Sequence, residues 1–228
     1  MRSLFSGKCI VVLAAATLLM SGVAAAMPLL PGFAYGTPKS EIAGREGAVV
    51  GKEAFVESVF LKGVTWASYA WTAQCHFTAE GLTGVTLYST YSRELLNHVS
   101  AHLKEQKFQL LGMIVDDKAL DMISLAKVGG YGAFQKRFRE LTRAKIPQKI
   151  SYEWFDVAKI HQEHLDNAAS LGQLLMLAPK DTLQIEVTQS ATGEKLEDSR
   201  LLIHFFYPVM DVSIRSQLHS PNDAASGE

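Results

Sequence analysis

The chain has 228 residues, of which 22 are basic and 23 acidic, so its formal net charge is −1. This near balance gives no argument for nucleic-acid binding, which relies on a strongly basic surface. The two cysteines, Cys9 and Cys75, exclude a disulfide framework, because Cys9 falls within an expected leader peptide. A mature chain of this length buries roughly 70% of its unfolded surface, which is enough for a core without cross-links.

Residues 1–26 have the three-part arrangement of a secretory signal peptide. Arg2 and Lys8 precede an apolar run over residues 10–20, and residues 24–26, all alanine, provide a cleavage site. The apolar run is shorter than the roughly 20 residues that a membrane-spanning helix needs. We therefore expect cleavage after Ala26, a mature chain without a transmembrane segment, and a periplasmic or secreted location.

The mature chain is expected to begin with an N-terminal linker. Residues 27–36 contain proline and glycine, and Thr37 then has the features of a helix cap, with Pro38 in the first turn of a short helix. We place the folded domain at residues 37–214. The polar and small residues of 215–228 indicate a disordered tail.

The first half of the domain has the periodicity of strands. Residues 57–63 form one predicted strand. From residue 67 to residue 77, apolar and polar side chains alternate with a period of two, which is typical of a strand with one buried and one wet face. Two glycines within residues 80–84, followed by β-prone residues, predict a hairpin.

A helix follows, capped by Ser92, with Leu96, Val99 and Leu103 as its buried stripe. Residues 109–115 read as the next strand. Helical spacing then returns over residues 117–127 and 133–144, separated by glycines within residues 129–132. The second of these helices carries an apolar stripe of Phe134, Phe138 and Leu141.

The last third of the domain is predicted to contain both strands and a helix. Residues 150–154 alternate as a short strand, and residues 156–177 have helical spacing that ends before Pro179. A final hairpin pairs residues 183–187 with residues 201–207 across a polar connection at 190–199. Because residues 201–207 are apolar on both faces, this strand is expected at the centre of the sheet. The fold class is therefore α+β, a single domain in which amphipathic helices pack against an antiparallel sheet built from hairpins.

Two histidine pairs are candidates for metal binding. His98 and His102 stand four apart on one helix, but the glutamate of a zinc-binding H-E-x-x-H motif is missing between them. His161 and His164 stand three apart, and Asp156 or Glu153 is a candidate third ligand. A metal-dependent hydrolase that uses His161 and His164 is therefore one hypothesis. The alternative is that these two histidines are partly buried and have only a structural role.

A basic helix face is the candidate binding surface for an anion or an acidic partner. Lys136, Arg137, Arg139 and Arg143, together with Lys145, lie mostly outside the apolar stripe of the same helix. A solvated helix surface explains the same pattern. The preceding glycines lack the Gly-Lys-Ser/Thr ending of a phosphate loop, so they are interpreted as a joint between two helices.

The sequence contains no complete set of catalytic residues. It has no Gly-x-Ser-x-Gly elbow, and Cys75 belongs to the apolar face of its strand. We expect no cofactor and a non-enzymatic binding or assembly protein of the cell envelope. Its partner is an envelope protein or a small apolar ligand, held on a sheet face or in a groove beside the basic helix. A structural subunit of an envelope complex is a further alternative, and the oligomeric state stays open.

Overall fold

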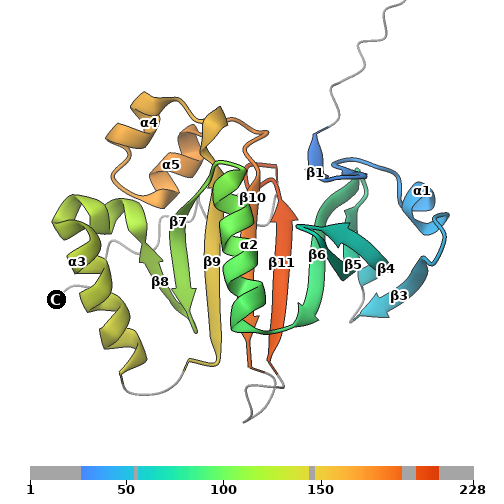
Figure 1. Ribbon diagram of the computed structural model, residues 1–228. Coiled ribbons are helices and arrows are strands. Elements are labelled where there is room, and N and C mark those ends of the chain that lie inside the picture. Colours follow the sequence, from blue (N-terminus) through green and yellow to red (C-terminus); the bar gives the residue numbers. More distant parts are fainter. Residues whose placement is uncertain (1–26, 54–55, 144–146, 192–198, 211–228) are drawn as a thin grey trace, which may run out of the picture.

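A computed structural model describes residues 27–53, 56–143, 147–191 and 199–210. The leader peptide and tail expected from the sequence lie outside these residues. Nine of the described strands are β3 (Val49–Glu53), β4 (Val56–Trp66), β5 (Tyr69–Thr78), β6 (Gly81–Thr90), β7 (Phe108–Val115), β8 (Lys118–Asp121), β9 (Lys149–Asp156), β10 (Gln184–Ser190) and β11 (Arg200–Phe206). They form one antiparallel sheet in the order β3-β4-β5-β6-β11-β10-β9-β7-β8 (Figure 1). The predicted α+β class is confirmed, and β11 lies at the centre of the sheet, as expected.

The turn between β4 and β5 shifts the start of the predicted alternating strand. Ala67 and Ser68, which were predicted as strand, have φ angles of 48° and 63°. A two-residue hairpin of this kind needs positive φ at both positions, because its twist then matches that of the strands. The strand therefore begins at Tyr69, and Trp71, Ala73 and Cys75 point into the core as predicted.

One face of the sheet is covered by α2 (Arg93–Glu105), which lies in front of the sheet in Figure 1. The Ser92 side chain caps this helix by accepting a hydrogen bond from the Leu95 amide at 3.0 Å. Val99 and Leu103 are buried against the main core, whose sheet residues come from six of the nine strands. This core includes Trp71, Val85, Leu87, Trp154, Ile185, Val187, Leu201, Ile203 and Phe205.

The predicted helix at 117–127 is wrong at its beginning. Asp116 has a φ of 56° and starts a turn, after which β8 pairs antiparallel with β7 and places Leu120 opposite Met113. The helix α3 (Met122–Thr142) begins only after this hairpin. The hairpin buries Leu120 in one apolar cluster with Met113 and Val115, and this burial favours the strand over a longer helix.

The single helix predicted over residues 156–177 is three short helical segments. These are η1 (Val157–Lys159), α4 (Gln162–Asn167) and α5 (Leu171–Leu177). Ile160 and Ala168 are extended, with ψ angles of 130° and 127°, and interrupt the helical backbone. Leu174 of α5 packs with Phe155 in a second apolar cluster, on the sheet face opposite α2.

Residues 27–36, for which the sequence predicts a linker, carry two short paired strands, β1 (Pro28–Leu30) and β2 (Phe33–Ala34). Leu29, Leu30 and Phe33 are buried in the main core, and the Tyr207 hydroxyl donates a hydrogen bond to the Pro28 carbonyl at 2.7 Å. The short helix α1 (Lys39–Ala43) follows. Thr37 does not cap it, because its hydroxyl donates instead to the Ala34 carbonyl.

No helix among the described residues is long and apolar enough to cross a bilayer.

Candidate functional site

The helix α3 is bent at Gly129 and Gly130. Gly130 has a φ of 58° and a ψ of −143°, a backbone conformation that side-chain-bearing residues avoid, and Gly129 is also non-helical. The glycine joint predicted from the sequence is thus present, although it is confined to these two residues. Its effect is to divide α3 into two halves that meet at an angle over β7 and β8.

Asp121 fixes the start of α3. Its Oδ1 accepts hydrogen bonds from the amides of Ile123 and Ser124, at 2.9 and 3.1 Å. Its Oδ2 accepts one from the Leu171 amide at 2.8 Å. One carboxylate therefore holds the first turns of both α3 and α5, which anchors the first half of α3 more firmly than the second.

An apolar groove of about 490 Å³ lies between the two halves of α3 and the sheet. It is lined by Leu110 and Met113 of β7, by Met122, Leu125 and Ala126 of the first half of α3, and by Gly130, Tyr131 and Phe134 at and after the bend. The Tyr131 hydroxyl is the sole polar side-chain group among these residues. Binding sites for small molecules are typically mostly apolar clefts of about 300–1,000 Å³, a range that includes this groove.

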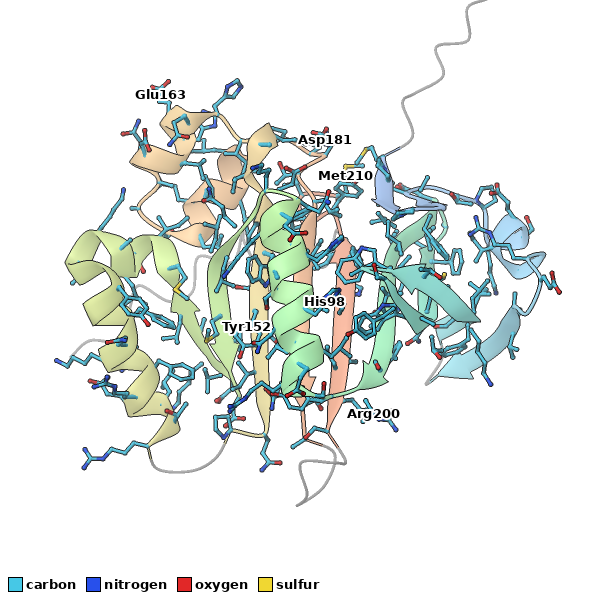
Figure 2. All side chains as sticks on the ribbon, viewed as in Figure 1. His98, Tyr152, Glu163, Asp181, Arg200 and Met210 are labelled. Atoms are coloured by element: carbon cyan, nitrogen blue, oxygen red, sulfur yellow. The ribbon has the colours of Figure 1, made fainter. Side chains whose placement is uncertain are left out.

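The outer wall of the groove has exposed apolar side chains near the glycine pair. Val128 and Tyr131, on either side of the glycine pair, are 83% and 73% exposed. Every residue of α3 is described and none is fully buried, whereas the shorter α2 buries three. Tyr152 lies between α2 and α3 and packs against the cores of both (Figure 2). The floor of the groove is therefore fixed, while its outer wall has few buried contacts to hold it.

Of the predicted basic residues, Lys136, Arg137 and Arg139 lie on the second half of α3, Arg143 is its C-cap, and Lys145 lies outside the described residues. Lys136, Arg137, Arg139 and Arg143 are exposed. Arg137 pairs with Glu140 at 3.1 Å, whereas in the described part of the chain the other three form no ion pair. A second hollow, of about 600 Å³, runs along this surface, but its described lining comes from α3 alone. Nothing described encloses a ligand there, so the apolar groove is the better-formed site.

The first histidine pair, on α2, is used in packing. His98 Nε2 lies 2.8 Å from the Ala67 carbonyl oxygen, and its ring contacts Tyr69. The His102 ring stands edge-on to Trp66, with 5.1 Å between the ring centroids. Both rings therefore hold α2 against the turn between β4 and β5.

The second pair, His161 and His164, is brought close together at the start of α4. Their ring centroids are 5.5 Å apart, and Nδ1 of His164 is buried without a described hydrogen-bond partner. Among the described residues, however, no group of three or more histidine, cysteine, aspartate or glutamate side chains is placed to hold a metal ion. Glu153, one proposed third ligand, instead accepts a hydrogen bond from Gln184. The two-histidine metal site stays a prediction.

The sheet face opposite α2 carries a row of polar side chains that sequence reasoning did not connect. Gln74, Thr86, His204, Glu186 and Glu153 are directly opposed on β5, β6, β11, β10 and β9, and directly opposed residues share a face. The only sequence signal for this row was that every second residue of the alternating strands is polar. Which strands are neighbours, and hence which polar residues meet, depends on the topology.

Within this polar row, Thr86 joins two histidines. Its Oγ1 lies 2.7 Å from His76 Nε2 and 2.8 Å from His204 Nδ1. Because a hydroxyl has one hydrogen to donate, at least one of these ring nitrogens must be protonated and act as the donor. Thr86 is only 6% exposed, so this network connects neighbouring strands of the sheet and does not form an open binding site.

Glu153 is the most perturbed carboxyl group of the polar row. Burial, helped by the neighbouring Glu186 and Asp121 carboxylates, raises its pKa from 4.5 to about 7, although the hydrogen bond from Gln184 opposes the shift. Gly112 makes room for this side chain, because a Cβ there would lie 2.0 Å from Glu153 Oε2. The result is a carboxyl group that changes protonation near neutral pH.

Cys75 is buried in the main core, and burial raises the pKa of its thiol to about 12. The thiol therefore stays protonated at neutral pH, which disfavours a nucleophilic role.

Comparison with models of known protein families, with curated protein sequences and with solved structures finds no significant match. The site must therefore be interpreted from its own geometry.

Proposed function

We propose that this chain is a non-enzymatic binding protein that holds a small apolar ligand in the groove beneath α3. The groove's size and its almost wholly apolar lining carry this proposal. The arrangement of the first 26 residues supports export, so the proposed place of action is the periplasm or the exterior of the cell. Assembly with an envelope protein is the competing use of the same exposed apolar surface.

The fixed floor and weakly held wall of the groove support ligand binding over simple core packing. Met113 of the floor is 5% exposed, whereas Tyr131 of the wall is 73% exposed. A core segment of this length would normally bury several apolar residues completely, and α3 buries none. A ligand in the groove would cover this apolar surface and would hold the second half of α3 in place.

A series of straight-chain primary alcohols tests the proposal by titration calorimetry. Each methylene buried in the groove contributes about 0.8 kcal/mol, so the affinity is expected to rise about fourfold per carbon until the groove is full. Ala126→Trp places a bulky side chain at an exposed position of the groove wall and should abolish binding. Ala101→Trp, at an exposed position of α2, is the matched control and should bind normally.

Absence of binding for every chain length would contradict the proposal, as would equal binding by the Ala126→Trp variant. A third contradicting result is binding that appears only when residues 211–228 have been removed. In that case the groove would be a docking place for a segment of the chain itself.

A further inference from the structure

A recess at the C-terminal end of α2 reaches the main core. It has a volume of about 380 Å³ and lies between that end of α2, β1 and the turn between β4 and β5. Leu29, Leu103 and Phe205, which form part of its lining, are each 1% exposed. Ordinary core packing leaves few gaps larger than a water molecule, so this space is too large to be a packing defect. We refer to it as the core recess.

Aromatic side chains form much of the lining of the core recess. Trp66, Phe108 and Phe205 all contribute to it. The Trp66 ring stands edge-on to Phe205, with the centroids 5.2 Å apart, and edge-on to His102 at the rim. Aromatic rings attract one another in such edge-to-face and in offset arrangements, beyond the effect of burial alone. The lining therefore favours an unsaturated ring system over a saturated group of the same size.

The rim of the core recess carries three polar side chains, those of Thr65, His102 and Gln106. Thr65 and Gln106 are exposed, and His102 is half-buried. No hydrogen bond of these three side chains is found among the described residues, whereas His98, one turn earlier on α2, lies against the Ala67 carbonyl. A hydroxyl, an imidazole and an amide can each donate and accept. A polar substituent of a ligand would therefore find partners at this rim.

The electrostatic surroundings of the core recess disfavour an ionic ligand. None of its described lining residues carries a carboxylate, an ammonium or a guanidinium group, and burying a charge without a partner is costly. The C-terminal end of a helix also bears a partial negative charge, which disfavours an anion there. A neutral hydroxyl group avoids both penalties, because it carries no charge and can direct its hydrogen toward the helix end.

We infer that the core recess binds a neutral hydroxylated aromatic compound, of the phenol class. Its ring lies against Trp66, Phe108 and Phe205, and its hydroxyl group is held at the polar rim. The volume of the recess falls within the range of about 300–1,000 Å³ that is usual for small-molecule sites. The inference does not depend on the proposed function, because the core recess and the groove beneath α3 share no lining residue.

Titration calorimetry at pH 7.5 with 2-naphthol, its saturated counterpart decahydro-2-naphthol and the anion 2-naphthoate tests the inference. 2-Naphthol should bind roughly two- to tenfold more tightly than the saturated alcohol, and naphthoate should bind more weakly than 2-naphthol. Gln106→Trp and Thr65→Trp each place a bulky side chain at an exposed position of the rim and should abolish 2-naphthol binding. Ala101→Trp, at an exposed position of α2 outside the recess, is the control and should bind normally.

The outcomes distinguish the core recess from the groove. Ala126→Trp, which fills the groove, should leave 2-naphthol binding unchanged. No binding of 2-naphthol, or equal binding by wild type and both rim variants, would overturn the inference, as would loss of binding in Ala126→Trp alone. Naphthoate or the saturated alcohol binding as tightly as 2-naphthol would contradict the assigned ligand class. If the straight-chain alcohols fail to bind while 2-naphthol binds as expected, the proposed function fails and this inference stands.

Discussion

Glu153→Gln is expected to raise the free energy of unfolding by about 2–3 kcal/mol at pH 8. The wild-type carboxyl group has a pKa raised from 4.5 to about 7, first by burial and then by Glu186. At pH 8 the folded protein must therefore keep a charged group in a site that favours the neutral form. Glutamine has nearly the same shape, carries no charge, and can still accept the hydrogen bond from Gln184.

The pH dependence of this effect has a definite direction. Because the folded pKa of Glu153 lies above the unfolded value, the folded state binds the proton more tightly, and stability from this group is present in full below about pH 4.5. It is lost as the pH rises toward 7 and is absent above that value. The advantage of Glu153→Gln should accordingly disappear near pH 4.5.

Urea denaturation of both proteins at pH 4.5, 6 and 8 measures the difference. Glu80→Gln, at an exposed turn between β5 and β6, is the control and should change stability by less than about 0.5 kcal/mol at every pH. A Glu153→Gln variant that is less stable than wild type at pH 8 would show that the ionised carboxylate is stabilised by its surroundings, contrary to the geometry described.

Trp71→Ala is expected to lower the free energy of unfolding by about 3–5 kcal/mol. Trp71 is 2% exposed, and its Nε1 donates a hydrogen bond to the Trp66 carbonyl at 2.9 Å. Its ring also meets Trp66 edge-on, with the centroids 6.1 Å apart. Truncation therefore leaves a large cavity and an unpaired carbonyl in the main core.

Tyr69→Ala provides the control for this substitution, because it removes an aromatic ring from the same strand at a position that is 43% exposed. It should cost less than about 1 kcal/mol in the same denaturation experiment. Similar losses for the two variants would mean that the strand does not bury the Trp71 face, and the assignment of the main core would be wrong.

Local sequence signals predicted the elements that have strong periodicity. Ser92 marked the start of α2, although Leu95, and not the predicted Leu96, is the buried residue of its first turn. The alternation through Trp71 marked β5 except for the two turn residues before Tyr69. The glycine pair marked the bend in α3. These features depend on neighbours in sequence, which a single chain displays directly.

The misassigned segments depend on strand pairing and burial, which the side-chain pattern alone does not show. Nothing local distinguishes residues 118–121 as β8, because that strand exists through its pairing with β7. The short apolar stretch at 27–36 resembles a linker until Leu29 and Phe33 are seen buried against the sheet. Helical spacing over 156–177 concealed two extended interruptions, at Ile160 and Ala168.

The candidate site was predicted only in part. The basic residues of α3 were identified from their spacing, and a groove beside them was expected without any lining residues. Those residues come from β7 and from both halves of α3, so their convergence requires the bend and the sheet order. The polar row, including Glu153, likewise requires knowledge of which strands are neighbours.

Methionine methyl NMR tests the central claim most directly. Met113 and Met122 line the groove, whereas Met176 on α5 is 61% exposed and lies outside it, and Met210 packs at the edge of the main core (Figure 2). Titration of ¹³C-methyl-methionine protein with decanol should shift the Met113 and Met122 signals together and leave Met176 and Met210 unchanged. Unchanged Met113 and Met122 signals at saturating decanol, or shifts confined to Met176 and Met210, would contradict the account.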